Sequence, residues 1–445
     1  MLKFKISNFS SVFRHLPQRE GGTGLAKKFL YTVIALAILL AAARLSPALS
    51  VFDEPASPSV SATAVPTPTP TPQRPEGTPA LITDTHSVYM SADSGNFHPE
   101  AGVTRAEACQ ILYGLMQNPV EGWCSYSDVN ETDPWYDAVA CLTAWGVLSN
   151  SDGPFRPDDA VTGLEFASML ENFSLTPGGN VSLSDKPLTR AEFCAVLNGA
   201  LGRSCDEGTL LVSGVPLYAD VSATDPYFAD IMEASVPHDF SETADGTEIW
   251  SGYTLQPGLY PLYGYLYYVD ESGQLARNVT CRFWTFGPDG RYTTGNTELD
   301  AYLHAALVSC VTPDMTSEEA LKAVYLYIKD NFSYLNLGQT PEDYDAVGWE
   351  YDRALYFFEN GGDTCFGFAA SFGLLARSLG YGAYIISGHV NEYYYPHSWV
   401  VIPEDGVNYI YDVELEYARP QRHADFDLFR ITNFSIYSYW YDPWW

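Results

Sequence analysis

A cysteine, a histidine and an aspartate in the last third of the chain have the types and the order that nucleophilic catalysis needs. Cys365 follows the stretch "GGDT" and opens an apolar run typical of a buried helix. Taken alone, such a cysteine is more often a small buried hydrophobic residue. At the first turn of a helix, however, unpaired amides and the helix dipole favour the nucleophilic thiolate. A thiolate used in this way needs a base close to it in the fold.

The sequence "HSWVVIPEDGVNYIYDVELEY" offers that base on a predicted β-hairpin. Two alternating segments, 397–402 and 409–414, flank an Asp-Gly pair that favours a tight turn. With the turn centred between the Asp and the Gly, Trp399 lies opposite Asp412 and His397 lies opposite Glu414. His397 and Asp412 then share one face of the hairpin as diagonal neighbours. We expect that face to point toward the helix of Cys365, with Val400 and Ile402 on the other face.

Cys365, His397 and Asp412 therefore form a candidate catalytic triad. In this arrangement Cys365 is the nucleophile, His397 is the base and acid, and Asp412 fixes the imidazole. Two alternatives remain open. Glu414 can orient His397 in place of Asp412, because direct cross-strand neighbours also interact. His389 is the other histidine nearby, but we expect a residue at the end of a strand, without an aspartate on the facing strand.

Predicted helices surround these residues. "TSEEALKAVYLYIKDNF" opens with a capping box formed by Thr316 and Glu319. A second helix is expected from about Trp349 to Phe358. The helix that begins near Cys365 carries its buried stripe at Phe368, Phe372, Leu375 and Leu379.

The order of a cysteine, a His-x-Trp motif and an aromatic-Asp pair resembles the transglutaminase-like superfamily. The resemblance covers about residues 297–418 and implies an α+β, papain-like fold with an antiparallel sheet and a Cys-His-Asp triad. It assigns those roles to Cys365, His397 and Asp412. It also implies chemistry on peptide or amide bonds through a cysteine thioester, with a protein or peptide as the substrate.

The middle of the chain repeats itself. "GNFHPEAGVTRAE" at residue 95 returns as "GPFRPDDAVTGLE" at residue 153, and "TRAEFC" follows at residue 189. "YSDVNETDPWYDAVACLTAWGVL" at residue 126 is echoed by "YADVSATDPYFADIMEAS" at residue 218. The threonine and glutamate of each T-x-x-E stretch predict a capped helix start. Repeats of this kind indicate stacked structural units.

These repeats resemble S-layer homology modules over about residues 81–240. The resemblance implies all-α helical repeats in which three modules form a clover. It further implies binding to an anionic secondary cell-wall polymer of Gram-positive-type bacteria, through arginines at Arg105 and Arg190. Gly163 replaces the arginine of the second unit, and the third unit lacks the F-x-P stretch. The alternative is that both arginines only form ion pairs on the helix surface.

The N-terminal residues have the pattern of an export signal. A basic segment precedes the apolar stretch "FLYTVIALAILLAAA" from Phe29 to Ala43. We expect a signal peptide or a signal anchor over residues 1–52, with residues 29–52 as a membrane anchor if it is not cleaved. Residues 53–80 are rich in Pro and Thr and predict an extended linker. The functional part is therefore expected at the cell surface or cell wall.

The remaining boundaries follow from changes in composition. Residues 241–296 predict short aromatic strands joined by turns, a β-hairpin bridge similar to the aromatic repeats of cell-wall-binding proteins. The transglutaminase-like domain is expected over residues 297–445, so the chain is multidomain.

Charge and cysteine content limit the function further. The net charge of -32 argues against nucleic acid as a partner, and membrane contact is expected only through the N-terminal segment. The eight cysteines have no C-x-x-C pair, and an odd number remains beside Cys365, so some thiols stay free. The acidic clusters lack the spacing of an EF-hand loop. We expect no metal and no organic cofactor.

The sequence therefore predicts an exported, wall-attached cysteine enzyme, most simply a hydrolytic peptidase or amidase. A protein-crosslinking transglutaminase is the alternative enzyme. A non-catalytic surface scaffold or adhesin is the alternative from another class.

Overall fold

The computed structural model describes residues 75–244, 246–337, 347–390, 395–418, 426–436 and 439–443. The expected export signal and most of the expected linker lie outside these ranges. None of the helices within the described ranges has the length and hydropathy of a membrane span.

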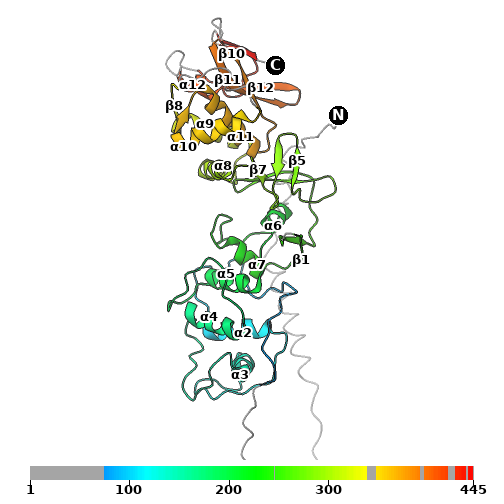
Figure 1. Ribbon diagram of the computed structural model, residues 1–445, viewed down its shortest axis with the longest axis vertical. Coiled ribbons are helices and arrows are strands. Elements are labelled where there is room, and N and C mark those ends of the chain that lie inside the picture. The colour runs from blue at the N-terminus through cyan, green and yellow to red at the C-terminus, as the bar shows by residue number, and fades with distance from the viewer. Residues whose placement is uncertain are drawn as a thin grey trace, which may run out of the picture. The chain divides into compact units, whose positions relative to one another are not determined.

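Six helices build the region of the sequence repeats. They are α2 (Arg105–Gly114), α3 (Tyr136–Trp145), α4 (Gly163–Asn172), α5 (Arg190–Leu201), α6 (Glu207–Ser213) and α7 (Phe228–Ser235) (Figure 1). The capping boxes predicted from T-x-x-E are present at α2, α4 and α5, where Thr104, Thr162 and Thr189 are the N-caps. One hydrophobic core joins these helices.

The starts of the three capped helices are linked to one another. Isolated β-bridges join Thr104 to Ala160, Thr162 to Pro187 and Gly102 to Thr189. The bridged residues lie in extended segments just before the helices. The repeat units therefore contact one another through these segments as well as through packed helices. The expectation that residues 81–240 are all-α is therefore not confirmed. Phe240, the last residue of that range, also lies in a strand.

Short antiparallel strands follow the repeats, as the aromatic pattern predicted. The pairs are β1 (Asp239–Glu242) with β2 (Glu248–Ser251), and β3 (Gly258–Leu262) with β4 (Tyr265–Val269). A three-stranded sheet contains β5 (Val279–Cys281), β6 (Trp284–Phe286) and β7 (Tyr292–Thr293). The Trp284 indole donates a hydrogen bond of 2.8 Å to the carbonyl oxygen of Arg377, so the three-stranded sheet contacts the helix that begins at Cys365.

The C-terminal part combines helices with an antiparallel sheet. Its helices are α8 (Thr297–Cys310), α9 (Ser317–Asn331), α10 (Trp349–Asn360), α11 (Cys365–Ser378) and α12 (Val413–Ala418). Its sheet has the order β12-β11-β10-β14-β13, with strands Val407–Tyr411, Tyr395–Glu404, Tyr384–Val390, Tyr439–Pro443 and Ser435–Ile436 (Figure 1). A short parallel pair, β8 (Ser333–Tyr334) and β9 (Gly362–Asp363), precedes α11.

The central part of strand β11 is buried on both faces of the sheet. Helix α11 packs on β11, and a Cβ atom at Gly373 would meet Val400 and Ile385 of the sheet. Val400 and Ile402 belong to the core that contains the buried residues of α11. Trp399 and its neighbours on the opposite face form a second cluster with Tyr441.

Candidate active site

Cys365 is the first residue of α11 and 6% exposed. Its N-cap is Thr364, whose buried hydroxyl has no hydrogen-bond partner among the residues that the structure describes. The preceding residue, Asp363, is buried and pairs through both carboxylate oxygens with Arg353. The ion pair of Asp363 with Arg353 therefore fixes the backbone two residues before Cys365.

His397 and Asp412 meet in the interior beside Cys365. His397 Nε2 lies 2.7 Å from Asp412 Oδ2, and these residues are 3% and 1% exposed. Burial lowers the pKa of His397, but the charge of Asp412 and the contacts with Asp412 and Cys365 outweigh burial and hold that pKa well above its ordinary value. Asp412 contacts Nε2 of the His397 ring, so Nδ1 is the ring nitrogen that is available to Cys365. The three predicted residues are thus brought together.

Asp412 is the first residue beyond strand β12. The predicted register is confirmed, since Val400 pairs with Tyr411 and Glu404 pairs with Val407. The predicted strand over 409–414 is wrong at its end, because helix α12 starts at Val413. Asp412 Oδ1 accepts a hydrogen bond of 3.0 Å from the amide of Leu415 and so caps that helix.

The two alternatives to the predicted pair are also located. Glu414 lies on α12 rather than opposite His397 on a strand, with Oε2 3.8 Å from His397 Nδ1. His389 lies in β10, and its position in the register faces Asp442 of β14. The expectation that no aspartate faces His389 is therefore wrong. His397 is the histidine that contacts Asp412 and Cys365.

The predicted orientation of the hairpin is wrong for Val400 and Ile402, which lie in the core that contains α11, whereas Trp399 lies in the cluster on the opposite face. His397 nevertheless contacts Cys365 at the start of α11, as predicted. The His397 and Trp399 rings stack with centroids 6.2 Å apart, and Trp399 lies 5.0 Å from the ring of Tyr441. The Trp399 ring therefore packs beside the His397 imidazole and is itself in contact with the Tyr441 ring.

Buried tyrosines that the sequence analysis missed complete the surroundings of Asp412. The Tyr441 hydroxyl donates a hydrogen bond of 2.9 Å to Asp412 Oδ2. The Tyr325 hydroxyl donates a hydrogen bond of 2.7 Å to Glu416 Oε2 and lies 3.1 Å from the Asp412 carbonyl oxygen. Glu416 in turn pairs with Lys329 at 2.8 Å. No local motif marks these residues, because tyrosine is abundant throughout the chain.

Arg105 and Arg190, the predicted polymer-binding residues, make equivalent contacts with F-x-P stretches. Arg105 Nε donates to the Phe155 carbonyl at 2.8 Å, and its guanidinium lies 4.8 Å from that ring. Arg190 Nε donates to the Phe97 carbonyl at 3.0 Å, again with 4.8 Å to the ring. Arg105 also pairs with Glu165 at 2.6 Å. Both arginines thus join units of the repeat region, while their binding to polymer stays a prediction.

All eight cysteines lie within the described ranges, and all are free. Cys109 and Cys194, which follow the TRAE motif, are fully buried. Burial raises the pKa of Cys109 to about 12, so this thiol stays protonated at neutral pH. Cys365 differs from both in having an imidazole beside it.

Comparisons with protein families agree with the two resemblances. Residues 305–410 match the model of the transglutaminase-like superfamily, and residues 125–167 match the S-layer homology domain. The first match contains Cys365 and His397 and ends two residues before Asp412. The chain therefore carries a transglutaminase-like domain with an S-layer homology domain on its N-terminal side.

The chain is also similar to surface proteins over short stretches. "Cell surface glycoprotein 1" of Acetivibrio thermocellus is 27% identical over 216 residues, 37% of this chain and 9% of that protein. "Surface-layer 125 kDa protein" of Lysinibacillus sphaericus is 32% identical over 91 residues, 20% of this chain and 8% of that protein. The chain thus spans less than a tenth of either relative. A "Crystal structure of a TGase" matches 26% of this chain and 30% of its own, with 16% identity and a TM-score of 0.21.

Proposed function

We propose that this chain is a cell-surface cysteine enzyme that hydrolyses amide bonds through a thioester at Cys365. The observation that carries the proposal is the buried pair of His397 Nε2 and Asp412 Oδ2, 2.7 Å apart, beside a cysteine at the start of a helix. The match of residues 305–410 to the transglutaminase-like superfamily supports the same chemistry.

In the first half of the reaction, the Cys365 thiolate attacks the carbonyl carbon of the amide and forms a carbon–sulfur bond. The carbon–nitrogen bond then breaks, and the leaving amine takes a proton from the His397 imidazolium. Asp412 keeps the imidazole oriented and stabilises its charged form. The backbone amide of Cys365 is a candidate donor to the developing oxyanion.

In the second half, a water molecule attacks the thioester and gives a proton to His397. The acid product leaves, and Cys365 returns to the thiolate. If an amine attacks in place of water, the same thioester yields a new amide bond, as in a crosslinking enzyme. Hydrolysis is the simpler proposal because water needs no binding site of its own.

The deciding experiment incubates the full chain with a peptide library in H₂¹⁸O, with and without a labelled primary amine. Mass spectrometry follows both the ¹⁸O-labelled acid products and the amine adducts. Acid products that are lost in Cys365→Ser support hydrolysis, whereas amine adducts in preference to acid identify a crosslinking enzyme. Cys310→Ser is the matched control, because it removes a partly buried thiol away from His397.

Thiol labelling separates an enzyme from a non-catalytic scaffold. An enzyme predicts fast alkylation of Cys365 at neutral pH, because the imidazolium stabilises the thiolate. His397→Gln is expected to slow that alkylation at least tenfold. Equal, slow alkylation of Cys365 in the wild type and in this variant would favour the scaffold.

The location at the cell surface rests on the repeat region. The S-layer homology match and the surface proteins that the chain resembles support attachment to a wall polymer. We assign the polymer contact to Arg105 and Arg190, as the resemblance implies. Export by the N-terminal segment, with or without cleavage, belongs to the same proposal.

A sedimentation assay with purified wall sacculi tests the attachment. Arg105→Lys with Arg190→Lys keeps both charges but removes the guanidinium geometry, and is expected to weaken binding several-fold. Arg156→Ala is the matched control, because this exposed arginine lies 3.5 Å from the same Glu165 that pairs with Arg105. Unchanged sedimentation of the double variant would refute the arginine assignment.

A further inference from the structure

Two histidines and two glutamates converge in the interior between the repeat region and the first hairpin. His86 precedes the first unit, Glu233 lies on α7, His238 follows that helix, and Glu248 opens β2. Their side chains are 0% to 4% exposed, and one ligand atom from each lies within 4.8 Å of all the others. Cys365, His397 and Asp412 contribute nothing to this cluster.

The distances among the four side chains are close to those of a metal site. His86 Nδ1 lies 3.0 Å from Glu233 Oε1 and 3.2 Å from Glu248 Oε1. His238 Nε2 lies 3.2 Å from the other oxygen of Glu233, Oε2, and 3.7 Å from Glu248 Oε1. Metal–ligand bonds of about 2.0–2.2 Å in a tetrahedron place neighbouring ligand atoms about 3.3–3.6 Å apart. The four observed distances bracket that spacing, and with one ligand atom per residue no two atoms are more than 4.8 Å apart.

The polar contacts of Glu233 are to the two imidazoles. Its Oε1 lies 3.0 Å from His86 Nδ1 and its Oε2 lies 3.2 Å from His238 Nε2, and within the described residues neither contact has the geometry of a hydrogen bond. Nδ1 of His238 lies 2.8 Å from the Val236 carbonyl oxygen, which can only accept, so Nδ1 carries a proton. Nε2 is therefore the ring nitrogen that faces the Glu233 carboxylate, 3.2 Å from Oε2, and it is the atom of His238 that can bind a cation.

Neighbouring side chains hold the ligands in these orientations. The Trp250 indole donates to Glu248 Oε1 at 2.9 Å, and the Ser204 amide donates to Oε2 at 2.8 Å. The His238 ring stacks on Trp250 with centroids 3.8 Å apart. Hydrogen bonds and stacking on the outer side of a ligand are characteristic of protein metal sites.

The nearest guanidinium does not neutralise the two carboxylates by contact. Arg203 directs its donors to backbone carbonyl oxygens of Ile82, Thr85 and Ser87. A divalent cation would balance the charges of Glu233 and Glu248 directly.

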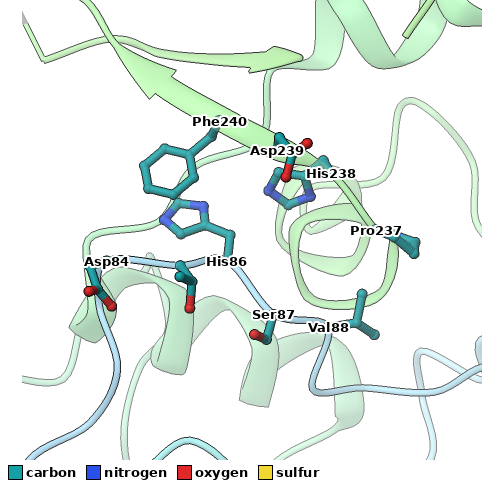
Figure 2. A pocket seen from close by; sticks show the side chains of 9 residues that line it. Asp84, His86, Ser87, Val88, Pro237, His238, Asp239 and Phe240 are labelled. Carbon is teal, nitrogen blue, oxygen red and sulfur yellow. The ribbon is translucent and has the colours of Figure 1, made fainter. Parts of the chain in front are cut away.

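A surface pocket of about 400 Å³ opens beside the two histidines. Figure 2 shows the His86 and His238 rings near each other, with the Phe240 ring lying on His86 at a centroid distance of 3.6 Å. Asp84 and Asp239 also line this pocket. Two of the four side chains, His86 and His238, therefore line a pocket that also carries acidic residues.

We propose that His86, Glu233, His238 and Glu248 bind one structural Zn²⁺ ion. Two imidazoles and two carboxylates suit zinc, and four protein ligands leave no open position for a reacting group. His86 and Glu248 are 162 residues apart in the chain, so the ion ties the start of the repeat region to the strands that follow it. No metal is expected from the sequence, because the cysteines form no C-x-x-C pair and the acidic clusters lack EF-hand spacing.

Metal analysis of the full chain tests the proposal without any activity assay. Chelator-treated protein is equilibrated with Zn²⁺ or Co²⁺, desalted and analysed by mass spectrometry for metal content. We expect one ion per chain, a visible Co²⁺ spectrum of tetrahedral intensity, and a thermal unfolding midpoint that rises by several degrees with Zn²⁺. Failure of the wild type to retain either ion at micromolar concentration would overturn the proposal and leave a proton-linked His–Glu network.

Two variants locate the ion. Glu233→Gln and His238→Gln keep the size and the polar character of the side chain, and each is expected to weaken Zn²⁺ binding at least a hundredfold. His98→Gln is the matched control, because this half-exposed histidine lies 3.8 Å from Asp220 outside the cluster. Stoichiometric Zn²⁺ in a folded Glu233→Gln/His238→Gln double variant would place the ion elsewhere and refute the site.

Discussion

Asp412 Oδ2 lies 2.7 Å from His397 Nε2, although neither residue is paired in the β11–β12 ladder. The last pair of that ladder is Val400 with Tyr411. Beyond it, the chain turns into α12, and Asp412 uses one oxygen to cap this helix and the other to hold the imidazole. The carboxylate is therefore fixed by backbone structure before any substrate binds, which is the preorganisation that a triad needs.

Replacement of Asp412 by asparagine tests this relationship. Asparagine also caps helices well, so Asp412→Asn should keep α12 and change the thermal unfolding midpoint little. The loss of the negative charge and of the imidazole tautomer should lower kcat/KM by about 10³- to 10⁴-fold on whatever substrate the library identifies.

Glu414→Gln is the matched control for that variant. Glu414 lies 3.8 Å from the other ring nitrogen, beyond hydrogen-bond distance, so its replacement should change kcat/KM less than about tenfold. Full activity of Asp412→Asn, or a larger loss in Glu414→Gln, would move the orienting role to Glu414.

The pH profile of activity should report the raised pKa of His397. Burial opposes the imidazolium, but the charge of Asp412 and the contacts with Asp412 and Cys365 outweigh burial and raise that pKa well above its ordinary value. The imidazolium therefore persists at neutral pH and is lost only as the pH rises through the raised value. We expect kcat/KM to fall on the alkaline side of neutrality, where the leaving amine no longer finds a proton donor.

The pH dependence of kcat/KM in Asp412→Asn tests whether Asp412 raises the pKa of His397. Without the carboxylate, the pKa of His397 falls, so the alkaline limb should move to lower pH. A limb that stays in place, or moves to higher pH, would show that another group sets it.

The hairpin and the capped helices were predictable because their causes are local. An Asp-Gly turn fixes the register, and threonine followed three residues later by glutamate marks a helix start. The side that α11 covers was not predictable. Alternation separates two faces of β11, but both are apolar and buried, so sequence alone does not say which one meets the helix.

The sequence contains a local signal for the end of β12, but the alternation of side chains along the segment also fits a longer strand. Asp412 is followed by an apolar residue and a glutamate, a pattern compatible with a helix cap as well as with a strand. Tyr441 and the four residues of the proposed zinc site had no such signal. Tyr441 is distant in the chain from Asp412, and His86 lies 162 residues before Glu248, so packing between distant segments brings each of them to its partners.

Tyr441→Phe tests how much the second partner of the Asp412 oxygen contributes. The hydroxyl donates at 2.9 Å to the same Oδ2 that holds His397, and its removal leaves the ring contacts in place. We expect a loss of about 0.5–1.5 kcal/mol in the free energy of unfolding and a several-fold decrease in kcat. A stability loss without any change in kcat would limit Tyr441 to a packing role.

Gly361 and Gly362 form a matched pair that tests how the chain reaches Cys365. Both have positive φ angles, of 72° and 153°, but they differ in what a side chain would meet. A Cβ atom at Gly361 meets nothing within 4 Å, whereas one at Gly362 would overlap the carbonyl oxygen of Ser333, where β8 pairs with β9. Gly361→Ala should therefore cost about 1–2 kcal/mol, the ordinary penalty for a left-handed alanine.

Gly362→Ala should cost more than about 3 kcal/mol, because the backbone of β8 has to move away as well. The same movement displaces Asp363 and Thr364, which directly precede the nucleophile, so alkylation of Cys365 should slow in Gly362→Ala and stay unchanged in Gly361→Ala. Urea unfolding of both variants measures the first effect, and mass spectrometry of the Cys365 peptide measures the second. Equal stability of the two variants would show that the parallel pair does not constrain the approach to Cys365.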